Sequence, residues 1–217
     1  MKGDIILIEE YHKQAASVIV SKITEKIKHK ATRYTITVAG ESGSGKSEIG
    51  KAIADELEKY DIKSVLLGQD DYFVLPPKLN DAKRRADPDW LGPHVEVKLA
   101  VLEQNLKDAL NGYGEITKPL VDYNANSVEK EIISLDGIWV VIAEGTYTSL
   151  LKNVDTKVFI DRNRVDTLEY RQRRNRGNEV GDPFVEQALM MEHKIIAGHK
   201  QLADIIITKD YDVIFVE

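Results

Sequence analysis

Gly40-Glu41-Ser42-Gly43-Ser44-Gly45-Lys46-Ser47 is the stretch of this 217-residue chain that decides its fold. It matches G-x-x-x-x-G-K-[ST], the pattern of a phosphate-binding loop. Residues 34–39 before it are β-branched and apolar, which predicts a buried strand, and residues 47–57 after it carry apolar side chains at helical spacing. A strand, a glycine-rich loop and a helix form the context that this motif requires, so we predict nucleotide binding at residues 40–47.

The residues of this stretch have distinct chemical roles in the prediction. Glycines let backbone N–H groups turn inward around an anion, and the following helix N-terminus adds a favourable dipole. We expect Lys46 to reach the β- and γ-phosphates and the hydroxyl of Ser47 to bind Mg²⁺. ATP and Mg²⁺ are therefore the expected cofactors.

Composition narrows the class of protein. The chain is 42% hydrophobic and has a net charge of −6 and no cysteine. A chain of this length can build one sizeable core, and its acidic balance argues against general affinity for nucleic acid or anionic membranes. Disulfide and thiol chemistry are excluded. The N-terminus lacks a signal-peptide profile and the apolar stretches are too short to span a bilayer, so a cytoplasmic protein is expected.

Apolar runs alternate with helical patterns along the chain. We predict strands at 4–9, 34–39, 63–68, 138–143, 157–160, 205–207 and 213–216. We predict helices at 11–30, 47–57, 95–110, 165–175 and 184–198, a hairpin at 114–134 and a long loop at 74–93. Unbroken apolar strands between helices indicate an α/β P-loop NTPase fold, with a parallel sheet covered on both faces.

The expected organisation is a single P-loop kinase domain over residues 1–217. Within it we expect an N-terminal extension at about 1–31 and a small arginine-rich lid at about 164–185. The apolar terminal segments 5–8 and 213–216 would pair with each other or with another subunit, so a homo-oligomer is one expectation left open.

Carboxylates follow two of the buried strands. Asp70 and Asp71 come directly after the strand at 63–68, which simple connectivity would put beside the phosphate-loop strand. Ligands of parallel sheets bind beyond the carboxyl ends of the strands, where a carboxylate can accept a proton from a hydroxyl nucleophile. We predict Asp70 as this base, against the alternative of a turn or helix cap. Glu144 ends the most apolar strand and is the predicted Mg²⁺ ligand.

Six arginines lie within fifteen residues, at positions 162, 164, 171, 173, 174 and 176. Arginine side chains bind phosphate oxygens and stabilise charge on a transferring phosphoryl group. Gly177 and Gly181 would let the segment close over the site. We predict a lid in which Arg171 and Arg174, three residues apart, contact phosphate. A solvated basic helix is the alternative.

The long loop and its surroundings hold candidates for substrate binding. Lys78, Lys83, Arg84 and Arg85 would bind a phosphorylated acceptor or simply be solvated. His94 follows a proline at a loop–helix junction and has a structural or a substrate-contacting role. Aromatic side chains that would line a pocket or belong to the core are Tyr72, Phe73, Trp90 and Tyr123.

Taken together, these segments resemble the uridine kinase and phosphoribulokinase family of P-loop kinases. The resemblance runs from about residue 35 to residue 210. Besides the phosphate loop and the arginine run after Asp161, it is carried by Gln69-Asp70-Asp71-Tyr72-Phe73, Asp87-Pro88-Asp89, Lys118-Pro119-Leu120-Val121-Asp122-Tyr123, Glu144-Gly145 and Ala203-Asp204-Ile205-Ile206-Ile207.

The resemblance implies an ATP- and Mg²⁺-dependent kinase acting on a small molecule. In the family the aspartate after the second strand is the base, which corresponds to Asp70, and the glutamate of the Glu-Gly pair helps to hold Mg²⁺, which corresponds to Glu144. Uridine or cytidine leads as the acceptor. A sugar phosphate such as ribulose 5-phosphate, or pantothenate, follows.

The acceptor segment departs from the family pattern. Uridine kinases carry Pro-x-Tyr-Asp-Phe followed shortly by a histidine, whereas Val121 stands at the tyrosine position here and no histidine follows. The acceptor is therefore left open. The candidate substrate-binding residues are Asp71, Tyr72, His94, Asp122 and Tyr123.

Two functions of other classes are also considered. A P-loop switch protein that recognises guanine would need Asn/Thr-Lys-x-Asp after a late strand, and Thr208-Lys209-Asp210-Tyr211 has tyrosine where aspartate is needed. A nucleotide-binding module without catalysis would fit the altered acceptor segment. The presence of Lys46, Ser47, Asp70 and Glu144 favours the kinase.

Overall fold

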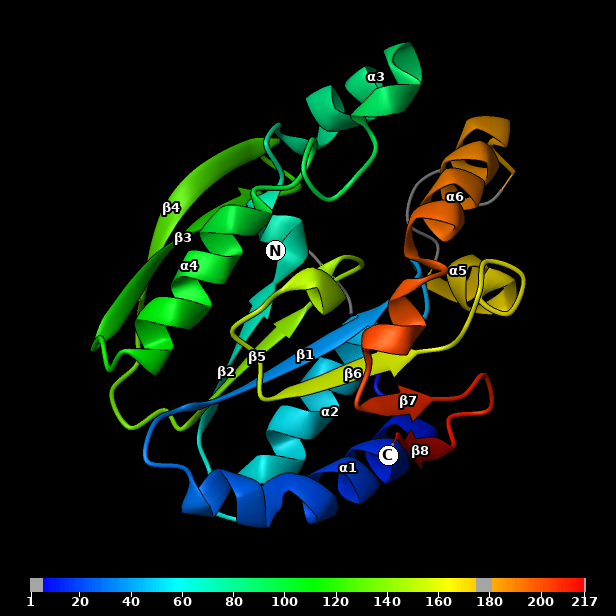
Figure 1. The fold of residues 1–217 in the computed structure, drawn as a ribbon. Coiled ribbons are helices and arrows are strands. Elements are labelled where there is room, and N and C mark those ends of the chain that lie inside the picture. The colour runs from blue at the N-terminus through cyan, green and yellow to red at the C-terminus, as the bar shows by residue number, and fades with distance from the viewer. Residues whose placement is uncertain (1–5, 175–180, 217) are drawn as a thin grey trace.

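The computed structural model describes residues 6–174 and 181–216, and the side chains of Arg173 and Arg174 lie outside this description. Within these residues one sheet has six strands, which in spatial order are β2 (Ser64–Gly68), β5 (Val140–Glu144), β1 (Tyr34–Gly40), β6 (Thr156–Ile160), β7 (Ile205–Ile207) and β8 (Val213–Phe215). All run parallel except β8, which is antiparallel to β7 (Figure 1). The predicted α/β fold is confirmed, and the sheet predicted to be parallel is parallel except at β8.

The order of the strands differs from the simplest expectation. β5 lies between β2 and β1, so the strand that leads to Asp70 is not beside the phosphate-loop strand. Glu144, the last residue of β5, is in register with Val38 of β1 and with Gly68 of β2. Because parallel strands end at one edge of the sheet, Glu144 lies between the phosphate loop and the Asp70 segment.

Helices cover both faces of the sheet. On one face α1 (Glu10–His29) packs on α2 (Lys46–Glu58), and Ile19, Ile23 and Ile53 are buried there against β1 and β5. On the other face α4 (Leu99–Leu110) buries Leu102 and Leu106 (Figure 1). Successive strand residues point to opposite faces, so an unbroken apolar strand feeds both cores.

The predicted hairpin is present as β3 (Glu115–Asp122) and β4 (Ser127–Ser134), which pair antiparallel. Residues 6–9 do not form the expected strand, and β8 pairs with β7 rather than with the N-terminal segment. The apolar residues at 6–8 instead lie along the body of the protein, where Ile8 packs against the core beside α1.

The long loop expected at 74–93 contains a helix, α3 (Pro77–Ala86), and a short 3₁₀ turn at Pro88–Trp90. The helix was not predicted because its exposed surface leaves few apolar residues to show a period. Proline is tolerated at its first turn, where no intrahelical N–H bond is needed. The buried Asn80 donates to Glu96 and accepts from Trp90, and these bonds fix the helix in place.

The predicted lid region contains α5 (Leu168–Arg174) and α6 (Pro183–Ile196), at the same end of the molecule as α3 (Figure 1). Part of the predicted lid at 164–185 lies outside the described residues. α3 and α6 contact each other through Arg85, whose Nη2 is 2.8 Å from Oδ2 of Asp182 and whose guanidinium lies 4.4 Å from the ring centre of Phe184.

Candidate functional site

The phosphate loop has the backbone that its glycines were expected to give. Gly43 and Gly45 have φ of +80° and +96°, which side-chain-bearing residues adopt at a cost. A Cβ at Gly43 would also lie 2.9 Å from Cγ of Arg171. Nζ of Lys46 donates to the carbonyl oxygen of Glu41 at 2.8 Å and so spans the loop. The loop is thus closed around the N-terminus of α2, where an anion is favoured.

The back of the loop is supported by both ends of the chain. Nδ1 of His12 in α1 accepts from the backbone N–H of Glu9, so Nε2 carries the proton and donates to the Tyr211 hydroxyl at 3.2 Å. Tyr211 in turn donates to the carbonyl oxygen of Ser44 at 3.2 Å and accepts from Arg162 at 2.6 Å. The N-terminal extension therefore contacts the phosphate loop through the turn between β7 and β8.

Glu144 and Ser47 meet beside the loop. The Ser47 hydroxyl donates to Oε2 of Glu144 at 3.2 Å. Burial, and to a smaller extent the nearby Asp70 carboxylate, raise the pKa of Glu144, whereas Lys46 and Ser47 lower it, and the net result is a pKa of about 7. The two residues predicted to hold Mg²⁺ are thus adjacent, and both offer oxygen ligands.

The oxygen donors of Ser47 and Glu144 fit Mg²⁺. Mg²⁺ prefers oxygen ligands and usually keeps several waters and substrate phosphate oxygens, rather than filling an all-protein cage. Within residues 6–174 and 181–216 no group of three or more His, Cys, Asp or Glu side chains is arranged to hold a metal. A hydroxyl and one carboxylate beside a phosphate loop agree with that partial protein ligation.

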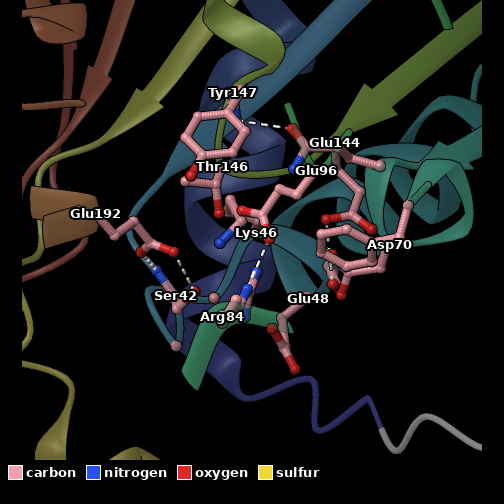
Figure 2. A pocket seen from close by; sticks show the side chains of 15 residues that line it. Ser42, Lys46, Glu48, Asp70, Arg84, Glu96, Glu144, Thr146, Tyr147 and Glu192 are labelled. Atoms are coloured by element: carbon pink, nitrogen blue, oxygen red, sulfur yellow. Dashed lines mark hydrogen bonds and ion pairs between the residues drawn. The ribbon is translucent and has the colours of Figure 1, made fainter. Parts of the chain in front are cut away.

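One cavity joins the loop to the carboxyl ends of β2 and β5. Figure 2 shows Lys46, Asp70, Glu144 and Glu192 around it. Its lining comprises residues of the loop and of α2 together with residues from more distant segments. We call the residues from the more distant segments the acceptor side of the cavity, and they are Gln69, Asp70, Phe73, Arg84, Glu96, Glu144, Thr146, Tyr147 and Glu192.

The two neighbouring aspartates have different surroundings. Asp70 is partly exposed and lines this cavity. Asp71 is buried, accepting from Nζ of Lys118 at 2.6 Å and from the backbone N–H of Val121 at 3.0 Å. Asp71 therefore ties the segment after β2 to the hairpin, while it also borders a second hollow next to Asp70. The base role of Asp70 and the substrate role of Asp71 stay predictions.

The predicted lid arginines can be placed only in part. Arg171 is buried over Gly43 of the phosphate loop, and its guanidinium contacts Oε1 of Glu186 at 3.3 Å and donates to the carbonyl oxygen of Arg164 at 3.0 Å. The side chain of Arg174 lies outside the described residues. Arg171 thus lies at the loop, on the side that a lid would cover.

α6 also contacts the loop, through residues that the sequence did not single out. The carboxylate of Glu192 accepts from the backbone N–H of Ser42 at 2.6 Å and from its hydroxyl at 2.8 Å. Nδ1 of His193 lies 2.5 Å from Oε1 of Glu41. Burial raises the pKa of Glu192, and Lys46 and the Ser42 hydrogen bonds oppose that shift. α6 is therefore paired with two consecutive loop residues.

The remaining substrate-binding candidates lie away from this cavity. Tyr72 is fully buried and donates to Asn105 at 2.9 Å. His94 is exposed, Asp122 accepts from the backbone N–H of Ala125, and Tyr123 at the hairpin turn is 58% exposed. None of the four lines the cavity in the described part of the chain, and their proposed role remains untested.

Five lining residues had no place in the predictions from sequence: Glu48, Glu96, Thr146, Tyr147 and Glu192. Glu96 carries a weak signal, because a carboxylate between Val95 and Val97 is unusual for an apolar stretch. Glu192 lies in a helix with no distinguishing pattern. Their contribution depends on tertiary contacts.

A curated uridine kinase of Bacillus cereus strain B4264 is 30% identical to this chain over 182 residues, which cover 79% of the chain and 84% of the relative. The chain belongs to the uridine kinase-like family of P-loop kinases. Kinases of this family use ATP and Mg²⁺ in general and act on small molecules. This confirms the family resemblance drawn from the ordered motifs.

A second curated relative of this chain is the bifunctional alpha-galactosidase/sucrose kinase AgaSK of Mediterraneibacter gnavus. It is 28% identical over 192 residues, which cover 83% of this chain but only 20% of that protein. Among solved structures, a possible uridine kinase from Bacillus stearothermophilus aligns with a TM-score of 0.63 and 15% identity, covering 89% of this chain and 97% of that one. That likeness supports the fold.

No protein-family model matches the chain. Within the described residues, none of the helices has the length and apolar character needed to span a bilayer. The family assignment rests on the curated uridine kinase at 30% identity.

Proposed function

We propose that the protein is an ATP- and Mg²⁺-dependent kinase that transfers the γ-phosphoryl group to a hydroxyl of a nucleoside, with uridine or cytidine as the leading acceptors. The observation that carries this proposal is one cavity shared by Lys46, Ser47, Asp70 and Glu144. Phosphoryl transfer needs phosphate positioning, charge stabilisation and a group that orients the nucleophile, and these residue types supply all three.

Each residue has a defined part in this proposal. The loop N–H groups and Lys46 bind the phosphates, and Ser47 with Glu144 would hold Mg²⁺, which supplies neutralisation of phosphate charge. Asp70 orients the acceptor hydroxyl and accepts its proton. Arg171, buried over Gly43, supplies positive charge near the transferring group.

A free sugar is the second candidate acceptor. It is favoured by the relative named as a sucrose kinase, which matches 83% of this chain. A sugar and a nucleoside both present hydroxyls on a ring, and they differ in the base that a nucleoside adds. Val121 replaces the tyrosine of the uridine kinase motif in the hairpin segment, so a nucleoside and a free sugar both remain candidate acceptors.

The test is a screen for acceptor-dependent ADP release with ATP and Mg²⁺, using uridine, cytidine, ribose, fructose and sucrose. We expect release with at least one of these acceptors, and a phosphorylated product by mass spectrometry. ATP binding without turnover on any acceptor in a broad panel would contradict the proposal and favour a module that only binds nucleotide.

A further inference from the structure

The acceptor side of the cavity has a surplus of negative charge. The described basic residues in the lining are Lys46, which belongs to the phosphate loop, and Arg84. The acidic residues on the acceptor side are Asp70, Glu96, Glu144 and Glu192. Like charges in a partly enclosed site repel strongly, so a phosphate or carboxylate on an acceptor would be disfavoured there.

Arg84 is held in one orientation by a buried carboxylate. Its Nε lies 2.6 Å from Oε2 of Glu96, whose side chain is 0% exposed, whereas Arg84 itself is 28% exposed. Glu96 also accepts from Asn80 at 3.2 Å and from the backbone N–H of Gly92 at 3.3 Å. Glu96 therefore has little capacity left for a ligand and instead fixes and neutralises the guanidinium.

The remaining donors of Arg84 are available to a ligand. Among the described residues, its two terminal nitrogens have no hydrogen-bond partner, because only Nε is engaged. The guanidinium carbon lies 5.4 Å from the ring centre of Phe73, which lines the same cavity. Figure 2 shows Arg84 extending toward Lys46 and Ser42 with its contact to Glu96.

This combination suits hydroxyl groups better than an anion. A planar guanidinium presents its N–H donors in a fixed fork, which matches two oxygens on neighbouring atoms. With its charge balanced by Glu96, Arg84 gives an anion little net attraction, yet its N–H groups still donate to neutral oxygens. An aromatic ring beside a few placed polar groups is the usual lining of a small-molecule site.

We propose that Arg84 selects an uncharged acceptor with neighbouring hydroxyls, such as a nucleoside or a free sugar, by donating to two hydroxyl oxygens, and that Glu96 is its positioning residue. This inference rests on the proposed kinase function. It disfavours the phosphorylated sugar and pantothenate, both anionic, that were considered from sequence.

The first experiment compares neutral acceptors with anionic partners of the same skeleton: fructose with fructose 6-phosphate, ribulose with ribulose 5-phosphate, and panthenol with pantothenate. We expect the neutral member of any pair that turns over to have the larger kcat/KM, by about tenfold or more. Preference for the anionic member would overturn the inference and leave the kinase proposal standing. Absence of turnover with these and all nucleosides would overturn both.

The second experiment changes Arg84, the arginine of the Arg84–Glu96 ion pair. Arg84→Lys keeps the charge but loses the fork, and we expect the KM for the acceptor to rise on the order of 10- to 100-fold while the KM for ATP changes little. Lys107→Arg, at an exposed position of α4 outside the cavity lining, is the control. Equal rises in both KM values, or no rise with Arg84→Lys, would contradict the assignment.

Glu96→Gln separates positioning from simple packing. Removing the balancing charge should leave Arg84 with net positive charge, so we expect the ratio of kcat/KM for anionic over neutral acceptors to increase. A merely structural role would lower both activities together. Thermal unfolding reports whether the variant folds. If it does not, Glu96→Asp replaces it: the shorter side chain keeps the balancing charge but shifts the guanidinium, so the KM for the acceptor should rise while the anionic-over-neutral ratio stays unchanged.

Discussion

The phosphate loop and the acceptor side of the cavity are built in opposite ways. The loop is eight consecutive residues, and its shape comes from local backbone geometry at Gly43 and Gly45. The acceptor side collects Phe73, Arg84, Tyr147 and Glu192 from four separate segments. A site for a common cosubstrate can be encoded locally, whereas a site for a particular acceptor depends on how distant segments pack.

Asp70 is where the two regions meet, and its substitution is expected to have the largest effect. Asp70→Asn removes the proposed base and should lower kcat by about 10³-fold, because general-base catalysis contributes factors of about 10² to 10⁴. ATP affinity, a property of the loop, should change little. The rate of ADP release at saturating substrates measures kcat, and a nucleotide titration measures the affinity for ATP. Equal losses in both would remove Asp70 from the base role.

Asp71 provides the contrasting substitution one residue away. Asp71→Asn removes the charge that balances the buried Lys118, which keeps a contact with Glu131 at 3.1 Å and donates to the carbonyl oxygen of Pro119 at 3.0 Å, so we expect unfolding free energy to fall by about 3 kcal/mol. Chemical denaturation measures this loss. In the fraction that remains folded, turnover should fall much less than in Asp70→Asn. A fully stable but inactive variant would instead support the substrate role predicted for Asp71.

His12, which contacts Tyr211 behind the phosphate loop, should make the unfolding free energy of the protein depend on pH. Burial and the nearby Arg162 lower the pKa of His12 from 6.5 to about 4. Below pH 6.5 the unfolded chain takes up a proton that the folded protein does not, so unfolding free energy falls as the pH drops. Between pH 7.5 and pH 5 this contribution amounts to about 2 kcal/mol.

His12→Gln tests this contribution, because glutamine does not titrate. The stability advantage of the original protein over the variant should shrink by about 2 kcal/mol between pH 7.5 and pH 5, as measured by urea unfolding at each pH. Parallel stability curves for the two proteins would show that His12 is not the group responsible.

The smallest expected effect is at the outer contact between α3 and α6. Arg85 is exposed and pairs with Asp182, so Arg85→Ala should raise the KM for the acceptor by less than about fivefold and leave the KM for ATP unchanged. High salt should reduce the difference, because exposed ion pairs are screened. A large effect on the KM for ATP would mean that this contact also controls the loop.

The sequence predicted those helices and strands whose own residues show an apolar period, and it missed elements that are fixed by contacts with distant segments. Strands β1, β5 and β6 and helices α1, α2 and α4 follow from apolar periodicity and were predicted to within a few residues. α3 was missed, because its apolar face is small and its position depends on the bonds of Asn80 and Arg84 to Glu96.

The candidate site shows the same division. Lys46, Ser47 and Glu144 were expected together, and the structure brings them together in one cavity. Tyr72, His94, Asp122 and Tyr123 were grouped by proximity to family motifs, and they lie outside that cavity. Glu192 reaches the loop only because α6 folds back over it, a contact between residues 150 positions apart.

The sequence by itself determined the nucleotide half of this kinase. A strand, eight loop residues and a helix are contiguous, so their spacing specifies the backbone that surrounds a phosphate. Only the tertiary structure decided that β5 separates the Asp70 segment from the loop strand, and that Arg84 stands paired with Glu96 beside Phe73. These arrangements depend on contacts between distant segments, which no local pattern of residues encodes.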